Sequence, residues 1–386
     1  MDPEERLAWL TLASVEGVGT LTFARLVGRF GGAAQALAAI RGGRLGPLAA
    51  ELRLRHAVRR ALAAAAADPA ALRAPLTELG LWSLIPFDRG WPAQLRSVPD
   101  PPVVLHGWGE AAALIAPHRV AVVGTRRPSP TGRLFATRLA DRLAEAGAVV
   151  VSGLAIGIDG AAHAAVVARG GRTVAVIGAG HRQPGPRAHR GLVRSIIDCG
   201  GAVISELGPQ AQAARGTYPR RNRILSGLAD TIMVVEAPAR SGAINTAHHA
   251  LEQGRGLLVA PGRPGDERTA GCLRLLRETE ARPLVGLDEA LADAGIDQLD
   301  PGSRADPTGP GPVAAGAGGG PAGLGQAERA VARRLGQGAA DLDELVAATG
   351  LAPATVASAL GLLQLRGWAQ ACGPAYLPAG PLLRGG

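Results

Sequence analysis

Short apolar runs alternate with segments of helical periodicity from residue 103 to residue 286. The runs are rich in Val, Ile and Ala and are apolar at nearly every position, which is typical of strands covered on both faces. The helical segments between them supply those covers. We therefore predict an α/β fold with an extended Rossmann-like, doubly wound, mostly parallel sheet. Its strands are expected at 103–107, 119–124, 148–153, 173–178, 202–206, 231–237, 257–262 and 282–286.

Smaller units are expected on either side of this sheet domain, which we place at 81–300. Residues 1–80 read as an all-helical domain, whereas 301–323 are rich in Pro and Gly without hydrophobic periodicity and predict a flexible linker. Residues 324–386 contain three helical patterns followed by a short hairpin, which indicates a winged helix.

The helical domain contains a tight turn at Gly17-Val18-Gly19 between two apolar helical patterns, within residues 8–30. This is the pattern of a helix-hairpin-helix or SAM-like domain, in which glycines let the backbone approach a phosphate. A plain turn between two helices explains the same residues, and the sequence leaves both interpretations open.

The net charge is +9, which favours a polyanionic partner. The chain contains no lysine, so all 41 basic residues are arginines, and a coding bias toward Gly, Ala, Pro and Arg accounts for part of that excess. Arginine abundance is therefore weak support for a binding function. The positions of the arginines carry the argument.

The sequence favours a cytoplasmic protein without disulfides. Its cysteines, Cys199, Cys272 and Cys372, are far apart and form no CxxC pair. The longest apolar window is interrupted by Asp159, His163 and several glycines, so no membrane span is expected. We expect no metal, because the cysteines are not spaced as a metal site and His248-His249 are adjacent. We expect no cofactor, because the chain has no GxxxxGK[ST] loop and the strand-end loops at 124–132 and 178–183 lack the GxGxxG fingerprint.

Loops at the carboxyl ends of the predicted strands are rich in Gly, Ser, Thr and Arg, and ligands of open parallel sheets bind at these ends. In the first loop, Gly124 permits close backbone approach and Arg126 can hold a phosphate with two hydrogen bonds. A helix is expected to begin near Thr131-Gly132, with free amides that favour an anion. Solvated arginines on an ordinary Rossmann turn are the alternative.

Two further strand ends carry polar residues. After the strand that ends at Ser152-Gly153, Asp159 is expected to cap a helix rather than to act as a catalytic acid. Ser241, Gly242 and Thr246 either cap the next helix or line the same anion groove. No Ser-His-Asp arrangement is evident around them.

The stretch "YPRRNRILSG" places three arginines within four positions, ahead of a predicted strand. Spaced at i, i+1 and i+3, they cannot all face one way. We expect one or two on a nucleic acid, and Arg223 buried against a carboxylate such as Glu206 or Glu236. A purely structural cluster is the alternative.

These motifs together resemble the DNA-processing protein A (DprA/Smf) family. The resemblance spans about residues 100–265 and rests on "VAVVGTR", "VVSGLAIGIDGAAHAA", "GRTVAVIGAG", "YPRRNRILSGLAD" and "VVEAPARSGAINTAHHALEQGR", which occur in the family's order. The flanking helical unit and winged helix also look like the family's accessory domains.

The resemblance implies a homodimer that binds single-stranded DNA, passes it to the RecA recombinase during natural transformation, and is not an enzyme. The nucleic-acid-binding residues that we predict are Gly124, Thr125, Arg126, Arg127, Ser152, Gly153, Arg187, Arg220, Arg221, Asn222, Arg223, Ser241 and Gly242.

The chain departs from the family pattern at two positions. Gly185 stands where the family usually has a tyrosine, and Thr131 precedes Gly132 where a tyrosine is common. Since only 3% of the residues are aromatic, few side chains are available for base stacking, which is worth about 1–3 kcal/mol per base. We therefore expect salt-sensitive binding that is dominated by the phosphate backbone.

Two further hypotheses concern function. Related Rossmann-like folds include hydrolases that cleave nucleoside monophosphates, and in this chain Glu206 or Glu236 would have to serve as the acid. In the winged helix, the expected recognition helix carries only one basic residue, Arg366, which favours a protein contact over reading of a DNA groove.

Overall fold

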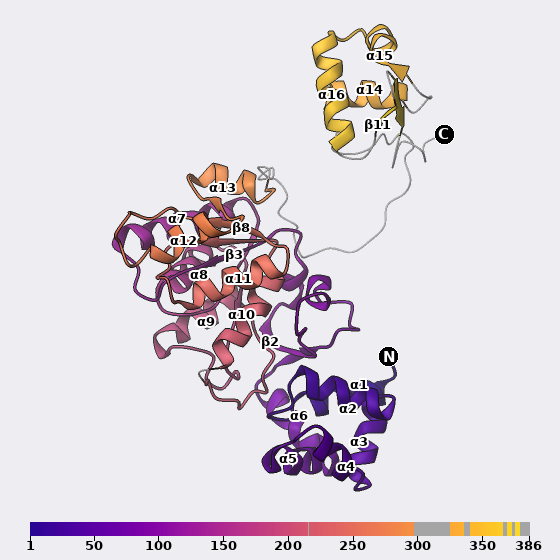
Figure 1. Ribbon diagram of the computed structural model, residues 1–386, viewed down its shortest axis with the longest axis vertical. Helices are drawn as coiled ribbons and strands as arrows, with labels where there is room; N and C mark the ends of the chain where they lie inside the picture. Colours follow the sequence, from indigo (N-terminus) through magenta and orange to yellow (C-terminus); the bar gives the residue numbers. More distant parts are fainter. Residues whose placement is uncertain (215, 297–324, 336–339, 366–368, 373–374, 379–386) are drawn as a thin grey trace. The chain divides into compact units, whose positions relative to one another are not determined.

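The structure is a computed structural model that describes residues 1–214, 216–296, 325–335, 340–365, 369–372 and 375–378. The chain forms two compact units, residues 1–304 and 305–386 (Figure 1). The linker predicted at 301–323 and Arg366 lie outside the described residues.

Six helices form the N-terminal part of the first unit, and Figure 1 shows them gathered around the N-terminus. Their shared core includes Phe23, Leu26 and Leu62, which are buried almost completely. The helices are α1 (Pro3–Ala13), α2 (Thr20–Phe30), α3 (Ala33–Arg41), α4 (Leu45–Glu51), α5 (His56–Ala67) and α6 (Pro69–Glu78).

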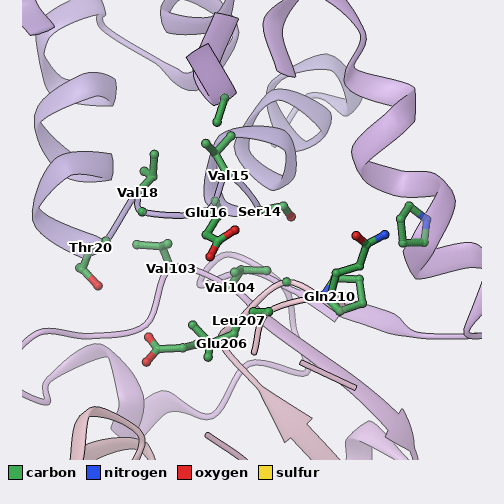
Figure 2. A pocket seen from close by; sticks show the side chains of 18 of the residues that line it. Ser14, Val15, Glu16, Val18, Thr20, Val103, Val104, Glu206, Leu207 and Gln210 are labelled. Carbon is green, nitrogen blue, oxygen red and sulfur yellow. The ribbon is translucent and has the colours of Figure 1, made fainter. Parts of the chain in front are cut away.

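This bundle packs directly on the α/β part of the unit. Arg6 forms an ion pair with Asp88 at 2.8 Å, and the indole of Trp9 donates to the carbonyl of Val103 at 2.7 Å. A cavity of about 510 Å³ lies between the α1–α2 turn and the loop that follows β6 (Ala202–Ser205). Figure 2 shows Glu16 and Val18 of the turn on one side of it and Glu206 of the loop on the other.

The α/β part is built on one nine-stranded sheet with the order β1-β2-β6-β5-β4-β3-β7-β8-β9. Strands β3 to β9 run parallel, which confirms the predicted doubly wound, mostly parallel architecture. The other strands are β1 (Trp82–Leu84), β2 (Leu105–Gly109), β3 (Arg119–Val123), β4 (Val149–Ser152), β5 (Thr173–Val176), β7 (Thr231–Val234), β8 (Gly256–Val259) and β9 (Arg282–Pro283).

Alternate residues of each strand enter different cores, because side chains alternate across a pleated sheet. Ala121 and Val123 face a core shared with α10 (Thr217–Leu228), α11 (Gly242–Glu252) and α12 (Ala270–Glu278). Val120 and Val122 face the opposite core. That core includes α7 (Pro130–Glu145), α8 (Ile158–Ala168) and α13 (Leu287–Asp293), and α9 (Arg190–Asp198) continues the layer over β5 and β6.

One edge of the sheet differs from the prediction. Strand β2 pairs antiparallel with β6, and a short strand that was not predicted, β1, pairs antiparallel with β2. At three residues and without full burial, β1 lacks the apolar run that identified the other strands. Single-turn 3₁₀ segments complete this unit at η1 (Ala93–Arg96), η2 (Ala111–Ile115) and η3 (Arg187–His189).

The second unit has the predicted winged-helix content. Helices α14 (Gln326–Leu335), α15 (Leu342–Thr349) and α16 (Pro353–Leu365) share a core that includes Val331, Leu345 and Leu363. A three-stranded sheet completes it, with the order β10 (Ala340–Asp341), β12 (Ala375–Pro378) and β11 (Ala369–Cys372).

Within the described residues, no single helix has both the length and the apolar composition needed to cross a bilayer. One pair of helices, Leu342–Thr349 and Pro353–Gln364, meets both criteria together, but a bend of 111° separates them.

Candidate nucleic-acid interface

The sheet changes its winding direction between β3 and β7. From β3 the chain adds β4, β5 and β6 on one side, and it then returns to place β7 and β8 on the other side. The connections therefore leave in opposite directions and open a crevice beyond the carboxyl ends, the usual ligand position in such folds. The two strand ends are tied together there by the Thr125 amide, which donates to the Glu236 carbonyl at 2.6 Å.

A cavity of about 490 Å³ lies at this crevice, and we call it the switch-point cavity. Loops after four parallel strands, β3, β4, β7 and β8, and the first turns of α10 and α11 contribute to its wall. Five of its side chains are arginines, against two carboxylates, Asp159 and Glu267. Among the predicted residues it brings together Gly124, Thr125, Arg126, Arg127, Arg221, Asn222, Ser241 and Gly242.

The first loop brings the backbone close to the next layer. A Cβ added at Gly124 would lie 2.6 Å from Cγ1 of Ile158 and 2.9 Å from the Glu236 carbonyl oxygen. The following arginines, Arg126 and Arg127, are exposed. The Arg126 guanidinium lies 5.6 Å from the centre of the Tyr218 ring, within cation–π range. This pair places a cation without an ion pair in the described residues and an aromatic ring side by side in the wall of the switch-point cavity.

Helix α7 begins one residue before the predicted start, and its first turn is already occupied. Ser129 is the N-cap and accepts from the amide of Gly132 at 2.9 Å. Glu236 accepts from the amide of Ser129 at 2.9 Å and also from its hydroxyl. The predicted attraction of an anion to free amides near Thr131 is therefore wrong in this respect, since the chain's own carboxylate occupies the place.

At the end of β4, the predicted residues Ser152 and Gly153 are buried in the protein's own packing. Ser152 is fully buried, and its hydroxyl donates to the Val122 carbonyl at 2.6 Å. Gly153 is buried beside Asp159 and Arg221, where an added Cβ would lie 2.6 Å and 2.7 Å from their side-chain atoms. Neither residue lines the switch-point cavity.

Asp159 does not cap α8 as predicted. Gly157 is the N-cap, with a φ of 102° that favours glycine, and Asp159 lies within the first turn. Its carboxylate turns back to the strand end and accepts from the Ala155 amide at 3.4 Å. Burial raises the pKa of Asp159 above its usual value, while Arg221 and nearby backbone amides act in the opposite direction.

The arginine side chains of the motif on α10 point in different directions. Arg221 is only 7% exposed, and its guanidinium donates to the carbonyls of Gly153 and Val176. Burial lowers the pKa of Arg221 to about 10, although Asp159 acts to raise it. Its Nε is buried and has no partner among the described residues, but the residue lines the cavity and so adds positive charge to its wall.

Arg223 points away from the cavity, as the prediction of a buried ion pair requires. It is 4% exposed and forms a bidentate pair with Glu206, at 2.9 Å and 2.7 Å. Its Nε also donates to the carbonyl of Asp100 at 2.7 Å. Of the two carboxylates considered in the sequence, Glu206 is thus the partner, and Glu236 belongs to the start of α7.

Helix α11 is held to α10 by amides. The Asn222 side chain donates to the Gly242 carbonyl at 3.2 Å and to Oδ1 of Asn245 at 3.0 Å. Ser241 caps α11 by accepting from the Ile244 amide at 3.4 Å, which confirms the capping interpretation. Both Ser241 and Gly242 nonetheless line the cavity, with Gly242 exposed.

Two predicted residues lie elsewhere. Arg187 is exposed on η3, beyond β5, and does not line the switch-point cavity. Arg220 faces the helical domain, where it lies in hydrogen-bonding range of Thr20 at 3.5 Å and pairs with Glu206 at 3.5 Å.

Tyr218, Arg240 and Arg268 are among the cavity-lining residues that sequence reasoning missed. Tyr218 is 38% exposed and is the aromatic surface that the low aromatic content concealed. Arg240 follows β7, which pairs with β3, and Arg268 follows β8, which pairs with β7, so their place at the ends of these parallel strands was the available signal. Arg240 forms no ion pair within the described part of the chain, whereas Arg268 pairs with Asp266 at 2.8 Å.

In the described residues, no group of three or more His, Cys, Asp or Glu side chains is arranged to hold a metal ion. The two glutamates proposed for a hydrolase are both bound by the protein's own donors, and neither lines the switch-point cavity.

Similarity to known proteins agrees with this architecture. Three family models match the chain: DNA recombination-mediator protein A at residues 82–295, the DprA winged helix domain at 316–373, and the DprA-like N-terminal HHH domain at 3–50. A putative DNA processing protein DprA from Mycobacterium tuberculosis is 34% identical over 388 residues, covering 96% of this chain and 93% of that protein.

Two solved structures are similar as well. The X-ray structure of DprA from Streptococcus pneumoniae has a TM-score of 0.62 at 31% identity, covering 75% of this chain and 98% of that one. A structure of DNA processing protein A from Helicobacter pylori, described for its single-stranded DNA binding mode, has a TM-score of 0.50 at 26% identity, with coverages of 55% and 94%. On the domain order, the doubly wound core and these similarities, the chain belongs to the DNA recombination-mediator protein A (DprA) family.

Proposed function

We propose that the switch-point cavity binds the backbone of single-stranded DNA, and that the chain is a recombination mediator without catalytic activity of its own. The observation that carries the proposal is the cavity itself, whose lining includes Tyr218 and three arginines without an ion pair in the described residues, Arg126, Arg127 and Arg240. Of these, Arg126 lies over the Tyr218 ring.

The preference for a single strand follows from the aromatic surface. An unpaired base exposes its face for stacking on a ring such as that of Tyr218, whereas the bases of a duplex are covered by their neighbours. Guanidinium groups around the ring can bind the flanking phosphates. The Helicobacter pylori relative, described as binding single-stranded DNA, supports the same assignment.

Handing the bound strand to the RecA recombinase, participation in DNA uptake, action as a homodimer and a cytoplasmic location complete the proposal. They rest on membership of the family. RecA filament formation on protected single strands, with and without the purified protein, tests the recombinase step, and light scattering tests the dimer.

The enzyme hypothesis has less support than it had from the sequence. A nucleoside monophosphate hydrolase would need Glu206 or Glu236 free beside the substrate, and both accept charged or short hydrogen bonds elsewhere. Release of free base from a nucleotide by the purified protein would restore that hypothesis.

Fluorescence anisotropy of labelled single-stranded and double-stranded oligonucleotides tests DNA binding, for wild type, Arg126→Ala and the control Arg277→Ala. Arg277 is 78% exposed on α12, where it pairs with its neighbour Glu278. The substitution Arg277→Ala removes one positive charge, as Arg126→Ala does, so the two variants have the same net charge. We expect Arg126→Ala to weaken single-strand binding about tenfold or more, since a charged hydrogen bond contributes about 1.5–3 kcal/mol. The control should stay close to wild type.

Affinity should also fall steeply with salt, with a slope of about −0.7 in log–log form for each phosphate neutralised. A flat salt response would contradict a contact with the phosphate backbone. Equal binding of both DNA forms, unaffected by Arg126→Ala, would move the site away from the switch-point cavity.

A further inference from the structure

The helical domain carries a concentrated positive charge that the proposed site does not use. Residues 53–60, "RLRHAVRR", contain four arginines and no acidic residue. All four are exposed, and none forms an ion pair with any described residue. Some other surface arginines of the unit, such as Arg142 and Arg169, are paired with carboxylates. We name the α5 arginine patch by its members, Arg53, Arg55, Arg59 and Arg60.

The local fold brings these side chains to one end of α5. Arg55 is the N-cap of the helix, and Arg59 follows it by one turn on the same face. Arg53 precedes them in a left-handed turn with a φ of 50°. Close packing fixes this end against the α1–α2 turn, because a Cβ at Gly17 would lie 2.6 Å from Cγ2 of Val58.

A chain of contacts connects this end of α5 with the switch-point cavity. A Cβ at Gly19, in the same turn, would lie 3.3 Å from the Arg220 guanidinium. Arg220 is the neighbour on α10 of Arg221, which lines the switch-point cavity. A smaller cavity of about 230 Å³ is lined by both arginines, and Arg220 also lines the cavity of Figure 2. Successive hollows therefore lead from the core to the helical domain.

The composition of the patch indicates which partner it fits. Protein interfaces depend on aromatic or large apolar anchors at their centre. None of the exposed large apolar side chains falls within 53–60. Unpaired guanidinium groups without such anchors suit a flexible polyanion.

We propose that the α5 arginine patch is a second contact for the phosphate backbone of the same single strand, reached as the strand leaves the switch-point cavity past the α1–α2 turn. The inference rests on the proposed function and extends it. It makes the helical domain part of the DNA-binding surface and lengthens the stretch of strand that is bound.

The test uses the full chain with the four patch arginines changed to alanine. Its control changes four other arginines that are exposed and have no ion pair in the described structure, Arg89, Arg138, Arg172 and Arg194, so both variants lose the same charge. Binding of oligothymidylates of about 6 and about 25 nucleotides is compared by anisotropy, lengths that bracket ordinary single-strand site sizes.

We expect the patch variant to bind the long oligonucleotide about tenfold less tightly, with a salt slope shallower by about 1–3, and the short one within about twofold of wild type. The control variant should bind both as wild type does. Equal losses in both quadruple variants, or an unchanged affinity of the patch variant for the long oligonucleotide, would overturn the proposal.

The variant Arg126→Ala distinguishes failure of this proposal from failure of the proposed function on which it rests. If that variant weakens binding of both lengths and the patch variant weakens neither, the switch-point cavity stands and the patch inference fails. If wild type binds neither length, the proposed function fails first. A patch variant that loses only duplex binding would make the patch a duplex site and overturn the single-strand path. Should the quadruple variant unfold, Arg59→Ala with Arg60→Ala gives the same comparison.

Discussion

Arg220, Arg221 and Arg223 are close in the sequence but differ in what surrounds their guanidinium groups. Arg223 is enclosed by Glu206 and the Asp100 carbonyl, Arg221 donates to strand-end carbonyls beneath the cavity, and Arg220 reaches the helical domain. The free energy of each group depends on these partners, because a buried charge is tolerated only when it is paired and hydrogen-bonded.

Replacing Arg223 should therefore affect folding more than DNA contact. Arg223→Ala leaves Glu206, 11% exposed, with only the longer contact to Arg220 at 3.5 Å, and we expect a loss of about 3 kcal/mol in the free energy of unfolding. Urea denaturation measures it, with Arg277→Ala as the exposed control, expected within about 0.5 kcal/mol of wild type. A stable Arg223→Ala protein that had lost DNA binding would contradict the structural role.

At the scale of elements, a carboxylate of the chain itself binds the N-cap residue of α7. Glu236, at the end of the run that includes β7, accepts from the backbone and hydroxyl of Ser129. The carboxylate fills the space over Gly132, where a Cβ would collide with it. This arrangement joins β7 to α7 and holds the loop that carries Arg126.

Gly132→Ala should consequently disturb both stability and binding. The added methyl group must displace the Glu236 carboxylate, and overpacking of this kind costs about 1–3 kcal/mol. Gly191→Ala is the matched control, because a Cβ on that α9 glycine meets nothing within 4 Å and should be neutral or stabilise by up to about 1 kcal/mol. Thermal unfolding compares the two, and equal stabilities would argue against the steric role of Gly132.

At the scale of the whole molecule, the winged helix folds around its own core, separate from the unit with the switch-point cavity. Its helix α16, Pro353–Leu365, contains no charged residue. Groove reading needs Arg, Lys, Asn or Gln side chains on such a helix together with phosphate contacts, and of these residue types α16 supplies only Gln364. We therefore assign the winged helix to a protein contact as a hypothesis.

Deletion of residues 324–386 should leave single-strand affinity within about twofold of the full chain, because the cationic cavity lies in the unit of residues 1–304. Anisotropy with the same oligonucleotides makes the comparison. A loss of tenfold or more would show that the winged helix contributes to DNA binding and would remove the reason for assigning it to a protein partner.

The doubly wound core and the winged helix could be predicted from the sequence, because both depend on local apolar patterns. Strands such as Arg119–Val123 and Thr231–Val234 are buried along their whole length, so their composition identifies them without knowledge of their neighbours. Because the carboxyl ends of parallel strands lie at one edge of a sheet, Arg126 and Ser241 could be assigned to the same edge from the sequence. In the structure, the strands that precede them, β3 and β7, are neighbours.

Tertiary structure alone decided which polar groups stay free. Whether an arginine meets a carboxylate, a carbonyl or solvent depends on residues far away in the sequence, as with Arg223 and Asp100 or Ser129 and Glu236. The same applies to β1 and β2, whose antiparallel pairing follows from the available sheet edge rather than from their own composition. Burial and pairing are properties of the assembled fold, and they separate the residues that can receive DNA from those that hold the cavity together.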